Sequence, residues 1–381
     1  MTMIYKYTGG TMPPINLLIK PASGSCNMRC RYCFYMDETS KREEENYGMM
    51  SLETLETIVQ KALAETEGAL DIGFQGGEPT LRGLDFYRKL IEIEKKHNTR
   101  GIRISHAIQT NGYLIDDEWA EFFAENHFLV GLSMDGNKDI HDTNRLDAAG
   151  KGTHSRVLRA AQILTRHKAE FNILVVVTRE LARSIGKAYG YFSKQGFNFQ
   201  QYIACLDPLY EQEGQQTYSL TPEMYGQFLC DLFDLWYQDL EKGKFVYIGY
   251  FINLINMLRG GRPQTCGMSG SCSRQHVIEA DGSVYPCDFY VLDEYRIGNL
   301  NTDSFEKINQ NRDALGFIPL SREIDEACKH CQWGPICRGG CRRNREPLVD
   351  GRLSHNYYCK SYQMFFNYAM PRLSALARSR S

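Results

Sequence analysis

Residues 25–35 of this 381-residue chain read SCNMRCRYCFY, and they directly follow an apolar run, Asn16–Lys20, with the pattern of a β-strand. The segment holds three cysteines, Cys26, Cys30 and Cys33, which are close enough in sequence for their thiolates to converge on one site. A closed zinc site normally takes four ligands, whereas three cysteines can hold a [4Fe–4S] cluster with one iron left open to another molecule. A zinc site with a distant fourth ligand remains the alternative on these residues alone.

Short apolar runs alternate with amphipathic stretches on the C-terminal side of this segment, as far as about residue 205. Ser51 has the position of an N-cap for the first amphipathic stretch. Such alternation is typical of βαβ units and a parallel sheet, here a complete or partial barrel of about six units, with its chemistry at the carboxyl ends of the strands. The expected strands are Asn16–Lys20, Asp71–Phe74, Ile102–Gln109, Phe128–Met134, Phe171–Thr178 and Phe197–Ala204, and the expected helices are Leu52–Glu65 and residues 116–126, 154–168 and 183–195.

The pattern changes from about residue 209 to long helical stretches and a cysteine-rich region. Helices are expected at residues 221–241, 247–259 and 361–377, and a hairpin is expected from Gln275–Glu279 and Ser283–Pro286. Eight cysteines lie in this region after residue 260, at positions 266, 272, 287, 328, 331, 337, 341 and 359. Eight is twice the four thiolates of a fully protein-ligated iron–sulfur cluster, although two zinc sites would use the same number. Cys205 and Cys230 are left over, and we expect them to be small buried apolar side chains.

The overall charge is nearly balanced, with 44 Lys and Arg against 46 Asp and Glu and a formal net charge of −2. This balance gives no electrostatic argument for a nucleic-acid or membrane-surface partner. No apolar run approaches the roughly 18 residues that span a bilayer, and the N-terminus lacks the features of a secretory signal. We therefore expect a cytoplasmic protein that binds neither nucleic acid nor membrane. Thirteen cysteines in that compartment indicate metal or redox chemistry rather than disulfides.

The spacing Cys-x3-Cys-x2-Cys resembles that of the radical S-adenosylmethionine superfamily, and the later cysteines resemble its SPASM extension. The segment Gly76–Pro79, GGEP, resembles the superfamily motif that receives the methionine amino group. The resemblance implies an α/β fold, with a partial (β/α)6 TIM-like barrel followed by a cysteine-rich domain that holds two auxiliary clusters. The implied boundaries are an N-terminal extension at residues 1–12, the barrel at 13–240, the SPASM domain with linking helices at 241–362 and a C-terminal helix at 363–381.

The same resemblance implies three [4Fe–4S] clusters and bound S-adenosylmethionine. Cys26, Cys30 and Cys33 would hold the first cluster. The auxiliary clusters would be held by Cys266, Cys272, Cys287 and Cys341, and by Cys328, Cys331, Cys337 and Cys359. The implied contacts to S-adenosylmethionine are Tyr32, Gly77, Ser133, Arg145 and Leu206.

Within that superfamily the chain resembles the anaerobic sulfatase-maturating enzymes from about Pro13 to Leu376. These enzymes oxidise a Cys or Ser of a sulfatase to Cα-formylglycine. The resemblance implies a nascent or unfolded sulfatase peptide as substrate, an electron donor such as flavodoxin or ferredoxin, Asp288 as the catalytic base, and substrate contacts at Tyr35 and Gln75. The segments that carry it are Leu17–Ser23, Cys30–Tyr35, Phe74–Thr80, Gln109–Gly112, Leu132–Gly136 and Asp281–Asp293.

Two other functions compete with sulfatase maturation. The first is another radical peptide maturase, which forms thioether or carbon–carbon cross-links. That class often carries a separate peptide-recognition domain before the first cluster, whereas only 25 residues precede Cys26 here, and Asp288 is in place. The second is a non-enzymatic redox sensor, which would need neither the GGEP segment nor a cluster with an open iron.

Overall fold

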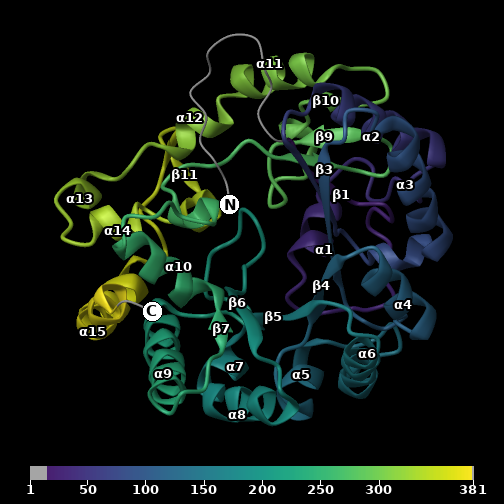
Figure 1. The fold of residues 1–381 in the computed structure, drawn as a ribbon. Coiled ribbons are helices and arrows are strands. Elements are labelled where there is room, and N and C mark those ends of the chain that lie inside the picture. Colours follow the sequence, from purple (N-terminus) through teal and green to yellow (C-terminus); the bar gives the residue numbers. More distant parts are fainter. Residues whose placement is uncertain (1–14, 380–381) are drawn as a thin grey trace.

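A single sheet of ten strands organises the molecule. The structure, a computed structural model, describes residues 15–379, so the expected N-terminal extension lies outside the described residues. The strand order is β10-β9-β8-β1-β2-β3-β4-β5-β6-β7. The sheet curves through the middle of the molecule, and α2, α3, α4, α6 and α8 cover its outer side (Figure 1).

The six strands expected in the first half of the chain are present and run parallel to one another. They are β1 Ile15–Ile19, β2 Ala69–Phe74, β3 Arg103–Thr110, β4 Phe128–Ser133, β5 Phe171–Val177 and β6 Phe199–Ala204. Buried apolar side chains such as Leu70, Ile108 and Val130 line the core between this sheet and its helices. The partial-barrel prediction is therefore confirmed.

The expected helices of this half are also present, with two differences. The helix expected at residues 183–195 begins two residues later, as α8 at Ile185, and α1, α3, α5 and α7 were not expected. The N-cap prediction is confirmed, since the Ser51 side chain accepts a hydrogen bond from the Thr54 amide. The helices are α1 Phe34–Thr39, α2 Leu52–Glu65, α3 Leu84–His97, α4 Asp117–Glu125, α5 Lys138–Asn144, α6 His154–Arg166, α7 Arg179–Arg183 and α8 Ile185–Gln195.

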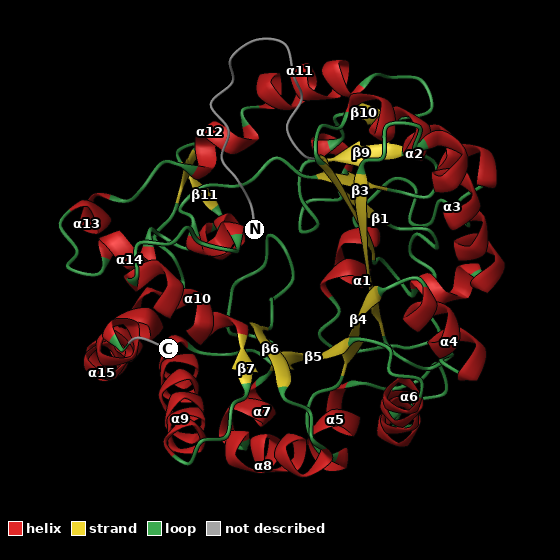
Figure 2. Ribbon diagram, viewed as in Figure 1, coloured by secondary structure: helices red, strands yellow, loops and turns green. Residues whose placement is uncertain are grey.

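The second half of the chain adds four strands to this sheet, together with a separate short hairpin. The helix expected at residues 247–259 begins two residues later than 247, because Tyr247 and Ile248 pair with β6 as strand β7. The elements are α9 Pro222–Glu241, β7 Tyr247–Ile248, α10 Gly249–Leu258, β8 His276–Ile278, β9 Ser283–Tyr285, β10 Gly298–Asn299, α11 Phe305–Leu315, α12 Phe317–Ser321, α13 Glu326–Lys329, α14 Gly334–Cys337, β11 Leu348–Val349, β12 Arg352–Leu353 and α15 Cys359–Arg378. Figure 2 shows that much of this half is loop between short elements.

The expected hairpin is present as β8 and β9, and it is joined edge to edge with the barrel. Strand β8 pairs in parallel with β1, with Leu17 opposite His276 and Ile19 opposite Ile278. The Lys20 amide continues this pairing by donating to the Ile278 carbonyl at 2.8 Å. The cysteine-rich region therefore extends the barrel sheet, and the chain that leaves β9 starts from the edge of the barrel.

The last helix, α15, fastens the end of the chain to the barrel side of the molecule. It packs along α9, and the two lie side by side in Figure 1. Phe365 of α15 is fully buried among the rings of Phe233, Tyr250 and Phe251. These contacts link α9, α10 and α15 into one apolar cluster.

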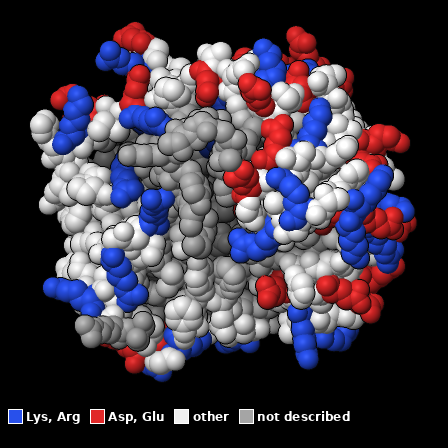
Figure 3. Space-filling model, turned by 45° about the horizontal axis from the view of Figure 1, so that its top comes forward, with Lys and Arg blue, Asp and Glu red and all other residues white. Residues whose placement is uncertain are grey.

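Charged side chains of both signs are interspersed on the face shown in Figure 3. Within residues 15–379, no helix is both long enough and apolar enough to cross a bilayer.

Replacing the buried ring of α15 tests this packing. We expect Phe365→Ala to lower the free energy of unfolding by about 3–5 kcal/mol, because a cavity replaces a fully buried aromatic ring. Tyr368 is on the same helix and is 46% exposed, so Tyr368→Ala should change the free energy of unfolding by no more than about 1 kcal/mol. Urea unfolding of both variants checks this, and equal losses would contradict the packing described for α15.

Candidate active site

The first three cysteines meet at the carboxyl end of β1. Cys26, Cys30 and Cys33 are close enough for their thiols to interact electrostatically. Burial raises the pKa of Cys26 to about 11 and that of Cys30 to about 12. These groups are therefore neutral thiols at pH 7 unless a metal binds and displaces the protons.

The loop that carries these cysteines is fixed against the GGEP segment. The Gly77 amide donates to the Ser23 carbonyl at 2.9 Å, and the Glu78 amide donates to the Ser25 carbonyl at 2.8 Å. A Cβ atom at Gly77 would lie 2.0 Å from the Ser25 oxygen, so no residue with a side chain fits there without moving the loop. The second glycine of GGEP is thus required by close backbone approach.

Glu78 ties together the loops that follow β2 and β3. Its buried carboxylate accepts hydrogen bonds from the Thr80 amide and hydroxyl, from the Thr110 hydroxyl and from the Asn111 amide. The Asn111 side chain in turn donates to Asn27 in the cysteine loop at 2.8 Å. Neither Glu78 nor Asn111 was predicted as a site residue. The sequence offered one signal for a role of these two residues, which is that an acid and an amide follow the ends of apolar strands.

A second buried group lies beyond β4. Arg145 Nε donates to Asp135 Oδ2 at 2.9 Å, and the Tyr32 hydroxyl donates to the same carboxylate. Asp135 also accepts from the Val176 amide at 2.9 Å, so it holds three elements together. Asp135 was not expected as a site residue. Of the other expected cofactor contacts, Gly77 and Leu206 lie just after β2 and β6, and Ser133 ends β4, all on the same rim of the sheet as the cysteines.

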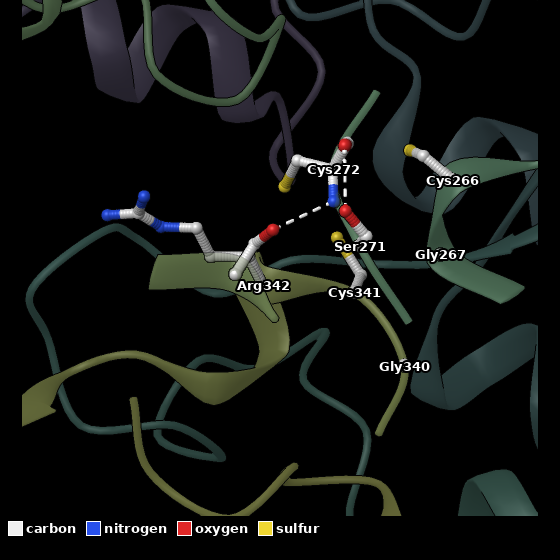
Figure 4. A pocket seen from close by; sticks show the side chains of 8 residues that line it. Cys266, Gly267, Ser271, Cys272, Gly340, Cys341 and Arg342 are labelled. Carbon is white, nitrogen blue, oxygen red and sulfur yellow. Dashed lines mark hydrogen bonds between the residues drawn. The ribbon is translucent and has the colours of Figure 1, made fainter. Parts of the chain in front are cut away.

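The eight later cysteines form two separate groups. In the first group the thiols of Cys266, Cys272, Cys287 and Cys341 interact electrostatically with one another. Burial raises the pKa of Cys341 to about 12 and that of Cys287 well above its ordinary value. Three of the four line a small recess, where Figure 4 shows Cys266, Cys272 and Cys341 around the opening.

The second group contains Cys328, Cys331, Cys337 and Cys359, whose thiols interact in the same way. Burial raises the pKa of Cys337 to about 11. The structure therefore assembles the same two sets of four that the family resemblance implied. Cys341 belongs to the first set, although the cysteines nearest to it in sequence belong to the second. Cys205 and Cys230 are both buried and stand outside these groups, as expected.

The chemistry of these donors fits iron–sulfur clusters. All thirteen cysteines are free thiols, which leaves every predicted ligand available. Within residues 15–379, no three His, Cys, Asp or Glu side chains are arranged to hold a single metal ion. A four-iron cluster spaces its ligands more widely, because each cysteine binds a different iron. The three-cysteine group and the two groups of four match the numbers of thiolates that such clusters take.

Asp288, which follows Cys287, reaches the carboxyl ends of β1 and β2. Its Oδ1 accepts a hydrogen bond from Lys20 Nζ at 2.6 Å, and its Oδ2 accepts from the Gln75 side chain. The Asp288 side chain is 13% exposed, so it retains a small opening to the outside. Gln75, predicted as a substrate contact, therefore lies beside the candidate base.

Tyr35 is buried, and its environment differs from that of a residue that faces a bound peptide. Its hydroxyl donates to Glu279, which also accepts from Arg42 Nη1 at 2.9 Å. The side chains of Arg42 and Glu279 are both completely buried. The Tyr35 ring packs with Val277, Tyr285 and Val291, and its hydroxyl is engaged in this buried pair.

Comparison with known proteins gives consistent matches along most of the chain. Residues 21–189 match the model of the radical SAM superfamily, and residues 266–332 match the SPASM iron–sulfur cluster-binding domain. A cysteine-type anaerobic sulfatase-maturating enzyme of Clostridium perfringens is 50% identical over 97% of this chain and 100% of its own length. The chain belongs to the anaerobic sulfatase-maturating enzymes.

Another curated relative and a solved structure cover nearly the same length. A serine-type anaerobic sulfatase-maturating enzyme of Bacteroides thetaiotaomicron is 31% identical over 96% of this chain and 92% of its own length. The solved structure of native anSMEcpe with bound AdoMet and Cp18Cys peptide has a TM-score of 0.92, with 49% identity, and covers 96% of this chain and 99% of that one. This sulfatase-maturating enzyme therefore uses S-adenosylmethionine and a [4Fe–4S] cluster in its barrel, and its SPASM domain binds further iron–sulfur clusters.

Iron content tests the number of clusters. We expect the anaerobically reconstituted protein to hold about twelve iron and about twelve sulfide ions per chain, and the Cys26→Ala/Cys30→Ala/Cys33→Ala variant to hold about eight of each. Iron and acid-labile sulfide assays on the same samples give the two numbers. A content near four, or zinc in place of iron in the native protein, would contradict three clusters.

Proposed function

We propose that this protein oxidises a cysteine of a sulfatase peptide to Cα-formylglycine. The observation that carries the proposal is the position of Asp288, which directly follows a candidate ligand of an auxiliary cluster and approaches the barrel mouth. The higher identity to cysteine-type than to serine-type relatives, 50% against 31%, supports cysteine as the target residue.

The oxidation requires the loss of a hydrogen atom, a proton and an electron from the target side chain. When bound, the clusters and S-adenosylmethionine supply the 5′-deoxyadenosyl radical that takes the Cβ hydrogen atom, and they accept the electron. Asp288 accepts the thiol proton, which leaves a thioaldehyde. Water then replaces sulfur and releases hydrogen sulfide. The hydrogen bond from the Gln75 side chain holds the Asp288 carboxylate in place for this step.

We assign the first cluster to Cys26, Cys30 and Cys33, and the auxiliary clusters to the two groups of four cysteines described above. S-adenosylmethionine would contact Tyr32, Gly77, Ser133, Arg145 and Leu206. The placement of Gly77, Ser133 and Leu206 on one rim of the sheet supports this assignment, as does the close backbone approach at Gly77. Gln75 remains a candidate contact for the peptide through its side chain. Tyr35 is a weaker candidate because its hydroxyl is already bonded to Glu279.

The first cluster must be reduced before each turnover. An external reductant is needed whenever the electron that the auxiliary clusters accept from the substrate is not passed back to the first cluster. We propose a one-electron donor such as flavodoxin or ferredoxin, and a location in the cytoplasm. Thirteen free thiols and cysteine-held clusters are compatible with a reducing compartment and not with an oxidising one. The implied substrate is an unfolded or nascent segment, because the target residue must reach the barrel mouth.

The mass of a treated peptide tests the reaction. A synthetic cysteine-type sulfatase peptide should exchange its target sulfur for oxygen and lose two hydrogens when it is incubated anaerobically with the reconstituted enzyme, reductant and S-adenosylmethionine. Mass spectrometry measures the change. Loss of the two hydrogens with retention of sulfur would instead indicate a cross-linking maturase and would contradict formylglycine formation.

Asp288→Asn tests the base. The substitution keeps the size of the side chain but removes the proton acceptor, so formylglycine should fall by roughly 10²- to 10⁴-fold. Cleavage of S-adenosylmethionine to 5′-deoxyadenosine should continue, because its contacts are assigned to the barrel. Product mass and 5′-deoxyadenosine yield are measured on one peptide after the iron content is checked. Near-normal formylglycine from a fully loaded variant would contradict the assignment of Asp288 as the base.

A further inference from the structure

Lys20 is a charged side chain in a fully buried position, and no role follows for it from the fold alone. It is the first residue after β1, and its side chain has 0% exposure. A buried ammonium group is strongly unfavourable unless an anion compensates it, because the charge has lost its water. The partners of Lys20 therefore decide what the residue does.

Asp288 is the anion that compensates Lys20. Their charged atoms are 2.6 Å apart, although the residues are 268 positions apart in the sequence. The Lys20 ammonium also lies 3.7 Å from the centre of the Tyr35 ring, which provides a cation–π contact. The Tyr35 ring is itself held in place, because its hydroxyl donates a hydrogen bond to Glu279.

A second carboxyl group, Glu38, lies nearby but does not replace Asp288 as the counter-ion. It is 2% exposed, and one of its oxygens has no hydrogen-bond partner. Burial and the neighbouring Asp288 charge raise the pKa of Glu38 well above its ordinary value, which favours its neutral form. The charge of Lys20 is accordingly matched by Asp288.

The stem of Lys20 is held as tightly as its ammonium. The backbone is fixed by the β1–β8 pairing, through the Lys20 amide and the Ile278 carbonyl. Gly76, the first glycine of GGEP, packs against the stem, and a Cβ there would lie 3.0 Å from Lys20 Cβ and 3.2 Å from its Cγ. Gly76 also has a φ of +119°, which side chains rarely adopt. The glycine leaves the space through which the lysine reaches Asp288.

We propose that Lys20 is the positioning residue for the Asp288 base. Lys20 holds Oδ1 and Gln75 holds Oδ2, so the carboxylate cannot rotate, and each oxygen still has a lone pair free for the substrate proton. Lys20 does not touch the substrate in this arrangement and acts only through Asp288. The inference rests on the proposed role of Asp288 as the base.

The test is a double-variant cycle on the reconstituted holoenzyme, with wild type, Lys20→Met, Asp288→Asn and the double variant. Methionine keeps the length of the lysine stem without its charge. We expect Lys20→Met to reduce formylglycine formation by roughly 10- to 100-fold, the effect of a misplaced catalytic group, with the KM for peptide changed by less than about threefold. The double variant should be within about threefold of Asp288→Asn alone, because Lys20 has nothing left to position.

A deuterium label separates positioning from general damage. With a peptide deuterated at the target Cβ, the transfer of deuterium into 5′-deoxyadenosine should change equally in Lys20→Met and Asp288→Asn, relative to wild type. Lys244→Met is the matched control, because Lys244 forms a 2.7 Å ion pair with Asp239 away from the site and is 37% exposed. Its formylglycine formation should equal that of wild type.

Cluster content and thermal unfolding are measured first on every variant. If Lys20→Met does not load with iron, Lys20→Gln replaces it, since its amide keeps a polar group in the buried site, and the same non-additivity with Asp288→Asn is expected. Near-normal product from a loaded Lys20 variant, or losses that multiply in the double variant, would overturn the inference while leaving Asp288 as the base. Near-normal product from Asp288→Asn would instead remove the proposed base itself.

Discussion

The parallel pairing of β1 with β8 is the contact on which the site depends. Strand β1 begins the barrel and leads into the three-cysteine loop, whereas β8 belongs to the cysteine-rich region more than 250 residues later. Because Leu17 lies opposite His276, the two regions share one sheet with a fixed register. That register brings Asp288, at the end of the hairpin, against Lys20 at the end of β1.

The shared sheet also explains why the proton acceptor and the proposed electron acceptor are neighbours. Asp288 follows Cys287 in the chain, so any movement of the cluster-binding loop would move the base as well. On the barrel side, Glu78 and Asp135 each bind groups from several strand ends and fix the loops around the first cluster. The reacting groups are thus held from both sides by buried hydrogen bonds, which suits a reaction that must keep water from a radical.

Much of the fold was predictable from local patterns, because strand alternation and cysteine spacing are properties of short segments. The six barrel strands, α2 with its Ser51 cap and the β8–β9 hairpin were expected at nearly their observed positions. The β1–β8 pairing was not, because a strand of three residues carries no signal for a distant parallel partner. The same limit applies to Lys20, whose counter-ion comes from that pairing, and to Tyr35, whose burial depends on Glu279 and Arg42.

A crystal structure of this protein, reconstituted and bound to S-adenosylmethionine and a cysteine-type sulfatase peptide, tests the central claim most directly. If the shared sheet positions the base, the target sulfur will lie within hydrogen-bond reach of the Asp288 carboxylate, at about 3 Å, with Lys20 still paired to its Oδ1. A target sulfur outside that reach, or an Asp288 that has turned away from Lys20 with the peptide bound, would contradict it.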